Sequence, residues 1–340
     1  MTRFTGLTLI SIGLYSLFNT ASSFADVSID DKQHCLLQQL QLAQGPETVA
    51  ELRNYCKQQA AQNRAKELVD TEVPEENSAE QALSDRIATE SLAEHNPFTI
   101  SSYRPNYLLY ASYNSNPNKE SFKATFPDGD VDRVEAKLQI SFKARVAKGV
   151  LGGDLWAAYS QQSWWQVYNN EESAPFRETN YEPELFLSWN TKFEVLGFTN
   201  RILTLGFNHE SNGRDDPLSR SWNRIVGGGT LEQGNLVLAG RAWYRLPEDD
   251  DDDDNPDILK YTGYGDISVF YKYKKQLLGI TLTNNLRSDN KGAIQLDWTF
   301  PMGDRFKGYL QYYNGYGESL IDYDHSINRI GIGILLNDWL

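Results

Sequence analysis

From Pro97 to the end of the chain, hydrophobic and polar side chains alternate, and this period of two constrains the fold more than any other feature. In the segment EAKLQISFKARV, at 135–146, every second residue is apolar and the residues between are polar or charged. Successive side chains of a β-strand point to opposite faces, so such a strand has one apolar and one polar face. An apolar outside and a polar inside are typical of a transmembrane β-barrel.

Twelve segments of this kind follow one another. They are 104–114, 132–147, 153–167, 179–195, 199–212, 219–232, 235–247, 258–274, 277–287, 291–301, 304–316 and 326–340. An even number of strands is the rule for bacterial barrels. We therefore predict an all-β domain over residues 97–340, a 12-stranded antiparallel transmembrane β-barrel with both ends in the periplasm, which ends in an aromatic-rich last strand.

The composition fits this fold and excludes one class of partner. A transmembrane helix needs about 20 consecutive apolar residues, and beyond the N-terminal stretch no such run occurs. The chain nevertheless carries 8 Trp, 19 Tyr and 15 Phe, and aromatic residues girdle a barrel at both membrane interfaces. Its net charge of -14 argues against binding to nucleic acid, whose phosphates require a basic face.

The N-terminal quarter has a different organisation. Residues 1–25 have the positive start, apolar core and small-x-small end of a secretory signal peptide. Residues 26–69 have helical periodicity broken at Gly45-Pro46, which predicts a small periplasmic helical hairpin, and Cys35 with Cys56 is expected to form a disulfide across it. Residues 70–96 read as an acidic linker. Export and a barrel pattern together predict the outer membrane of a two-membrane bacterium.

The stretch FNHESNGRDDPLSRSWNR, at 207–224, contains the candidate chemistry. His209 and Ser211 are two residues apart on a strand, so both side chains point the same way, as a base and its nucleophile require. The Asn-Gly and Asp-Asp-Pro turn signals predict a hairpin, and its second strand would bring Asn223 beside His209. We predict a Ser-His-Asn triad for acyl transfer.

The parity of the strand indicates where this site faces. Leu203, Leu205 and Phe207 share the face of His209 and Ser211, so the site is expected on the lipid-facing surface, toward the outer leaflet. The opposite face carries three charged residues that are predicted to form an interior network. They are Glu210, Arg220 and Arg224.

HESNG followed by SRSWNR resembles the signature of the outer membrane phospholipase A family. The resemblance covers roughly residues 97–340 and includes SWWQVYNNEESAPFRETNYEPELF, NPD at 255–257 and GYGESLIDYD at 315–324. It implies a calcium-dependent phospholipase that hydrolyses sn-1 and sn-2 acyl esters of phospholipids and lysophospholipids through an acyl-enzyme. It also implies that the active form is a homodimer.

The resemblance assigns further roles to individual residues. It implies that Ca²⁺ is held by the hydroxyl of Ser219 and the backbone carbonyl of Arg214, with the carbonyl of Ser173 supplied by the neighbouring subunit. The amide of Gly213 would complete the oxyanion hole. Gln161 corresponds to a membrane-embedded glutamine of the dimer interface, although an interior-facing polar residue is the alternative interpretation.

The acidic run from Glu248 to Asp257 is most simply a solvated loop. By resemblance, Asp216 and Asp254 form a second calcium site used in the monomer.

If odd strands run outward, the connections 167–178, 213–218 and 248–257 all emerge on the outer face. We therefore expect three segments that are distant in sequence to meet around the predicted site.

Two non-enzymatic interpretations remain open at this point. The same barrel could be a passive pore, with HESNG reduced to a hairpin of no chemical importance. It could also be a structural or adhesive surface protein whose acidic loop binds cations or partners. Neither alternative accounts for the predicted placement of His209, Ser211 and Asn223.

Overall fold

A computed structural model describes residues 100–249, 251, 253–303 and 306–337, together with Cys56, Leu83 and Arg86. The chain divides into one unit of residues 1–77 and a second of residues 78–340, which contains the β-structure. The predicted signal peptide, Cys35 and nearly all of the predicted helical hairpin and linker lie outside the described residues. Cys56 is disulfide-bonded, and its pairing with Cys35 stays a prediction.

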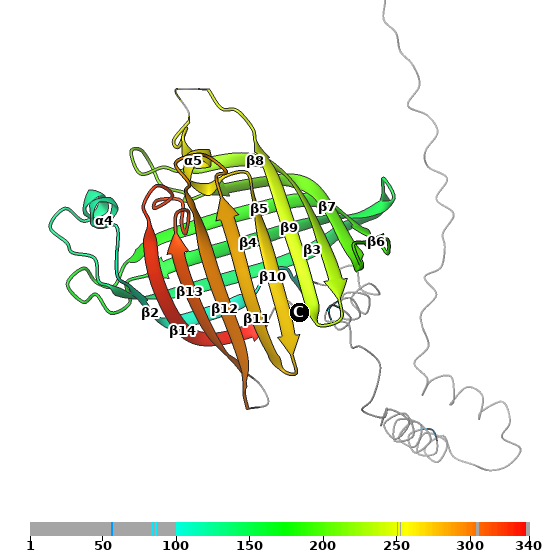
Figure 1. Ribbon diagram of the computed structural model, residues 1–340. Helices are drawn as coiled ribbons and strands as arrows, with labels where there is room; N and C mark the ends of the chain where they lie inside the picture. The colour runs from blue at the N-terminus through cyan, green and yellow to red at the C-terminus, as the bar shows by residue number, and fades with distance from the viewer. Residues whose placement is uncertain are drawn as a thin grey trace, which may run out of the picture. The chain divides into compact units, whose positions relative to one another are not determined.

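In the described part of the chain, twelve antiparallel strands form a closed barrel (Figure 1). They are β2 (Asn106–Asn114), β3 (Val134–Val150), β4 (Gly153–Trp165), β5 (Phe176–Asn190), β7 (Phe198–Ser211), β8 (Ser221–Gln233), β9 (Leu236–Arg245), β10 (Gly265–Tyr273), β11 (Gln276–Asn284), β12 (Gly292–Met302), β13 (Phe306–Gly315) and β14 (Ile327–Asn337). Each strand pairs with its neighbours in sequence, and β14 pairs with β2 to close the ring. The predicted twelve-stranded barrel is thus confirmed.

Two short strands and two short helices accompany the barrel. β1 (Ile100–Ser102) pairs with residues 142–144 in the middle of β3, and β6 (Glu194–Val195) pairs with the start of β7. The helices α4 (Lys119–Thr125) and α5 (Ile258–Thr262) lie at the same end of the barrel (Figure 1). We call this end, which also carries loops 166–175, 212–220 and 246–257, the loop end. Among the described residues no helix has the length and apolar character needed to span a membrane.

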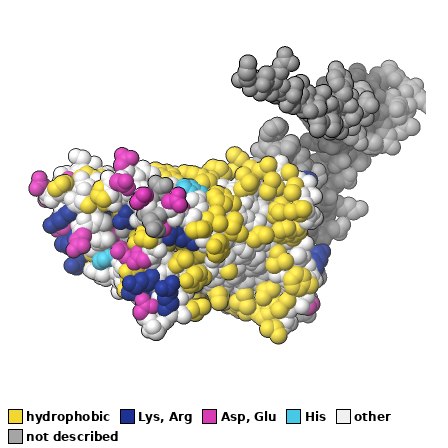
Figure 2. Space-filling view, turned by 90° about the horizontal axis from the view of Figure 1, so that it is seen from above, with side chains coloured by type: hydrophobic (Ala, Val, Ile, Leu, Met, Phe, Trp, Pro, Cys, Tyr) yellow, Lys and Arg dark blue, Asp and Glu magenta, His cyan; other side chains and the backbone are white. Residues whose placement is uncertain are grey.

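The strands alternate as the sequence predicts. On β3, Ile140 and Phe142 are 50% and 39% exposed on the outside, whereas Lys137 and Ser141 are almost completely buried in the interior. Figure 2 shows a broad band of hydrophobic side chains over the strands, with Lys, Arg, Asp and Glu gathered at one end. In water such a surface would be costly, whereas in a bilayer the band meets hydrocarbon.

One predicted strand begins too early. The segment 258–274 was expected to be extended throughout, but Ile258–Thr262 forms α5 and the strand starts only at Gly265. The side chain of Ile258 is 1% exposed and packs into a cluster with Trp222 and Trp243 at the loop end. This apolar stretch is therefore buried in a loop and does not face lipid.

Buried charges fill the loop end of the barrel interior. Arg177 contacts Glu135 at 3.1 Å and Asp322 at 2.5 Å, while Glu318 lies 3.1 Å from Lys137 and 2.9 Å from Arg329. Burial alone would raise the pKa of Glu318, but Arg329 and Lys137 lower that pKa to about 2. Residues 318–323, from the family-like GYGESLIDYD segment, are all buried. The loop between β13 and β14 therefore folds into the barrel.

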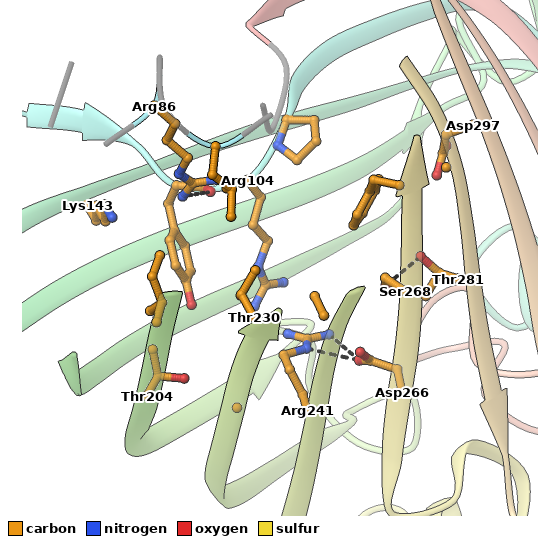
Figure 3. A pocket seen from close by; sticks show the side chains of 18 of the residues that line it. Arg86, Arg104, Lys143, Thr204, Thr230, Arg241, Asp266, Ser268, Thr281 and Asp297 are labelled. Atoms are coloured by element: carbon orange, nitrogen blue, oxygen red, sulfur yellow. Dashed lines mark hydrogen bonds and ion pairs between the residues drawn. The ribbon is translucent and has the colours of Figure 1, made fainter. Parts of the chain in front are cut away.

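The barrel interior is not completely filled. A cavity of about 410 Å³ lies between the strands and is lined by polar side chains that include Arg104, Arg241 and Asp266 (Figure 3). Arg241 and Asp266 pair at 2.6 Å. Leu83 and Arg86 also line this space, and the amide of Leu83 donates to Glu232 at 2.7 Å. These two residues, which precede the barrel in the sequence, therefore lie at its interior.

Candidate functional site

The β7–β8 hairpin brings His209 and Asn223 together. The two residues are direct partners in the antiparallel register, and Nδ1 of His209 lies 2.9 Å from Oδ1 of Asn223. Leu205 and Phe207, on the same face of β7, are 49% and 42% exposed on the outside of the barrel. The structure thus places this pair on the lipid-facing surface near the loop end, with Nε2 as the remaining ring nitrogen of His209.

Ser211 ends β7 on the same face. It pairs with Ser221 across the hairpin and with Tyr181 of β5 on its other side. Among the described residues, Ser211 has no hydrogen bond to His209. Hydrogen bonds between a nucleophile and its base are often long in enzymes without substrate and tighten in the reacting complex. The two side chains share one face two residues apart, which allows them to approach each other.

The side chain of Asn212 organises the turn that follows. Its Oδ1 accepts from the amides of Arg214 at 3.3 Å and Arg220 at 3.0 Å, and its Nδ2 donates to the carbonyl of Leu218 at 2.9 Å. The Asn-Gly signal predicts a turn at Asn212, but it does not indicate that this side chain makes three hydrogen bonds within the loop. Buried Asn212 therefore fixes the path of the loop beside Ser211.

Gly213 has a backbone conformation that favours glycine. Its φ is +63°, and a Cβ atom there would lie 3.2 Å from a ring carbon of Tyr181. The ring of Tyr181 therefore packs close to the residue whose amide is the predicted oxyanion donor. Tyr181 belongs to the family-like segment that begins at Ser163, but its sequence position alone gave no reason to single it out.

The predicted calcium residues lie in two loops. The hydroxyl of Ser219 donates to Oδ2 of Asp254 at 2.5 Å, which joins loop 212–220 to the acidic loop. Arg214 lies in the same turn, and its Nε pairs with Glu178 at 3.2 Å. Asp216 is exposed, and no contact among the described residues joins it to Asp254.

Ser173 lies in loop 166–175 with a φ of +58°. Within the part of the chain that the structure describes, no hydrogen bond joins Ser173 to Ser219 or Arg214. The described residues also contain no group of three or more His, Cys, Asp or Glu side chains with the geometry of a metal site. The predicted ligands are instead a hydroxyl and backbone carbonyl groups, one of them from a second subunit.

The interior network differs from the prediction at one position. Arg224 contacts Glu210 at 2.8 Å and Glu182 at 3.2 Å, as part of a cluster inside the barrel. Arg220 does not join it, and its guanidinium donates to the backbone carbonyls of Pro217 and Ser219. The prediction for Arg220 is wrong because this residue belongs to the turn and precedes the first residue of β8.

The three outer connections meet as expected. Arg214 of loop 212–220 donates to the carbonyl of Arg177, at the start of β5. On the other side, the amide of Ser221 donates to Oδ1 of Asn255 at 3.0 Å. The amide Nδ2 of Asn223 donates to Oε1 of Glu248 at 2.9 Å. The acidic run was expected to be a solvated loop, but Glu248 and Asp254 fold back onto the hairpin.

Gln161 lies on the outside of β4, where it pairs with exposed Ile140 of β3. Its Oε1 accepts from Tyr159 at 3.0 Å, and its Nε2 donates to Ser163 at 3.2 Å. The structure therefore places this amide on the membrane-facing surface, and the alternative of an interior-facing residue is incorrect.

Comparison with known proteins adds an independent line of evidence. The family model described as Phospholipase A1 matches residues 83–336. A phospholipase A1 from Escherichia coli strain K12 is 42% identical over 260 residues, which cover 76% of this chain and 88% of the relative.

Two solved structures agree with that result. Outer membrane phospholipase A from Escherichia coli is 40% identical with a TM-score of 0.66, over 72% of this chain and all of that one. An outer membrane phospholipase dimer from Salmonella typhi with bound calcium is 40% identical with a TM-score of 0.69, over 74% of this chain and 97% of that one. The predicted resemblance is confirmed, and the chain belongs to the Phospholipase A1 family of outer membrane β-barrel enzymes.

Proposed function

We propose that this outer membrane phospholipase cleaves acyl esters with Ser211 as nucleophile, His209 as general base and Asn223 as the residue that orients His209. The contact of 2.9 Å between His209 Nδ1 and Asn223 Oδ1, on the lipid-facing surface, supports this assignment most directly. A site there can receive an acyl ester from the outer leaflet. The proposed substrates are phospholipids and lysophospholipids, at both the sn-1 and sn-2 positions.

The proposed steps of ester cleavage use Nε2 of His209, the ring nitrogen that does not contact Asn223. Nε2 of His209 accepts the proton of Ser211 while Oγ attacks the ester carbonyl. The protonated imidazole then donates this proton to the leaving alcohol, which departs as a lysophospholipid or a glycerophospho compound, and an acyl-enzyme remains. Water, deprotonated by the same nitrogen, releases the fatty acid and regenerates Ser211. The amide of Gly213 is proposed to donate to the oxyanion of each tetrahedral intermediate.

Calcium is the proposed cofactor, and the oxygen atoms near the triad fit it. Ca²⁺ prefers hydroxyl, carboxylate and carbonyl oxygens, and Ser219, Asp254 and the backbone of Arg214 offer these groups. We assign Ser219 and Arg214 to the catalytic ion, and Asp216 with Asp254 to a second ion in the monomer. When bound, the catalytic ion would supply positive charge that stabilises the developing oxyanion. The Salmonella typhi relative was solved as a dimer with bound calcium.

Dimerisation is proposed to complete the catalytic ion's ligand set. The carbonyl of Ser173 would come from the second subunit. Gln161 is proposed to lie at the interface, because a polar amide that faces lipid is stabilised by a hydrogen bond to a partner on a second barrel. Within one barrel, the amide bonds to Tyr159 and Ser163 of the same strand.

The test is fatty-acid release from mixed micelles of phospholipid and detergent by the full-length protein, with calcium or with a chelator. We expect calcium-dependent release in the parent and a loss of at least about 10⁴-fold in Ser211→Ala, because a nucleophile acts as one unit with its base. The exposed Ser115→Ala provides a matched control that should leave the rate unchanged. Release that survives in Ser211→Ala would refute the proposed nucleophile.

A further inference from the structure

Asn223 has a second partner besides His209. Its Oδ1 lies 2.9 Å from Nδ1 of His209, and its Nδ2 donates to Oε1 of Glu248 at 2.9 Å. The amide of Leu246 also donates to the carbonyl of Asn223 at 2.8 Å, which ties the chain just after β9 to β8. The imidazole, the amide and the carboxylate therefore form a continuous chain from β7 through β8 to the beginning of the acidic loop.

We propose that Glu248 is a positioning residue that fixes the amide orientation of Asn223 and, through it, the tautomer of His209. This inference rests on the proposed function of Ser211, His209 and Asn223. It assigns a role to the first carboxylate of a run whose sequence indicates only a solvated loop.

The argument depends on which atoms can donate. An asparagine amide can turn by 180° and exchange its donor and acceptor ends. A carboxylate only accepts, so Glu248 satisfies Asn223 when Nδ2 points toward it, and the reversed amide would set two acceptors against each other. Oδ1 must then face His209. Because Oδ1 only accepts, Nδ1 of His209 carries the proton and Nε2 keeps the lone pair that a general base needs.

Glu248 is itself held in place. Its Oε2 lies 3.6 Å from the guanidinium of Arg245, which also pairs with Asp253 at 2.5 Å and donates to the carbonyl of Asn255 at 3.0 Å. The side chains of Arg245 and Glu248 are 8% and 17% exposed. The negative charge of Glu248 thus lies beyond Asn223 as seen from His209, and Arg245 balances it. The residue in direct contact with His209 at the lipid boundary is the neutral Asn223.

The experiment compares Glu248→Ala and Glu248→Gln with Asp249→Asn, in the full-length protein with saturating calcium. Asp249 is exposed in the same loop, so Asp249→Asn matches the charge change of Glu248→Gln without touching the hairpin. We expect Glu248→Ala to lower kcat by about tenfold, the equivalent of one charge-assisted hydrogen bond. KM should change by less than about twofold, Glu248→Gln should lie between, and Asp249→Asn should equal the parent.

A double-mutant cycle separates positioning from a general effect on the loop. In the Asn223→Ala background, Glu248→Ala should cause no further loss, because its effect passes through Asn223. The imidazole ¹⁵N spectrum should show His209 protonated at Nδ1 in the parent and a mixture of tautomers in Glu248→Ala. Parent-like kcat in Glu248→Ala, or losses that multiply with those of Asn223→Ala, would overturn the proposal.

Failure of the triad itself would look different. In that case Ser211→Ala and Asn223→Ala would both retain parent activity. If only the role of Glu248 is wrong, Ser211→Ala is inactive and Asn223→Ala is impaired, while Glu248→Ala behaves like Asp249→Asn. The half-maximal calcium concentration should stay the same in Glu248→Ala. An increase in it would assign Glu248 to calcium binding and would also overturn the proposal.

Discussion

The inward and outward faces of the β7–β8 hairpin are built from alternate residues of the same two strands. Inward, Asn208 and Arg224 are 1% and 7% exposed and belong to a network of charged and amide groups. Outward, Phe207 and Ile225 are 42% and 38% exposed, and His209 shares their surface. The inward face holds the register, and that register places His209 opposite Asn223. A slip of one residue would exchange the two faces.

The largest expected effect concerns activity alone, on the outward face. His209→Gln keeps a polar side chain but removes the base, so the rate of fatty-acid release should fall by about 10⁴-fold or more. The urea midpoint of unfolding in detergent micelles should stay within error of the parent, because few contacts depend on this ring. Residual activity above about one tenth of the parent would show that the outward face is not the site of the chemistry.

The next effect concerns stability, on the inward face. Arg224→Met removes the cation from Glu210 and Glu182, which lie at 2.8 Å and 3.2 Å inside the barrel. Glu182 would keep its ion pair with Arg104 at 2.5 Å. Glu210 would lose its cation inside the barrel, so the free energy of unfolding should fall by about 3–5 kcal/mol. Denaturant titration followed by tryptophan fluorescence measures this change. An unfolding free energy equal to that of the parent would mean that the inward network does not hold the hairpin.

A smaller effect separates the two environments at neighbouring positions. Leu205 is 49% exposed to the outside, whereas Thr204 lines the interior cavity (Figure 3). Leu205→Lys should destabilise the barrel by about 2–4 kcal/mol if it lies near the bilayer midplane, and by less toward the interface. Thr204→Lys should cost under about 1 kcal/mol because its charge enters a polar lumen. The free energy of unfolding of each variant is measured in lipid vesicles. A larger loss in Thr204→Lys than in Leu205→Lys would contradict the assignment of faces.

Much of this arrangement could be predicted from local patterns. The period of two located all twelve strands, because each face of a barrel strand meets one environment throughout its length. The turn signals between Ser211 and Ser221 set the register that places Asn223 opposite His209. The parity of the strands also placed three outer loops on one side, as the contacts of Arg214 and Asn255 show.

The remaining features depend on contacts between distant segments. Ile258 has the pattern of a strand start, yet it begins the helix α5 and packs against Trp222 and Trp243 at the loop end. Arg220 shares the parity of Arg224, but the turn ends later than its signals indicate. The contact between Glu248 and Asn223 forms only because the acidic loop folds back over β8, and a run of like charges gives no sign of which carboxylate does so.

The central claim, that the nucleophile lies on the lipid-facing surface at Ser211, is tested most directly by covalent labelling. The full-length protein in detergent with calcium is treated with a fluorophosphonate, and the modified residue is located by peptide mass spectrometry. We predict a single adduct on Ser211 that appears in parallel with the loss of activity and is absent from His209→Gln. An adduct on another serine that accounts for the inactivation would contradict the claim, as would unlabelled Ser211 in fully inactivated protein.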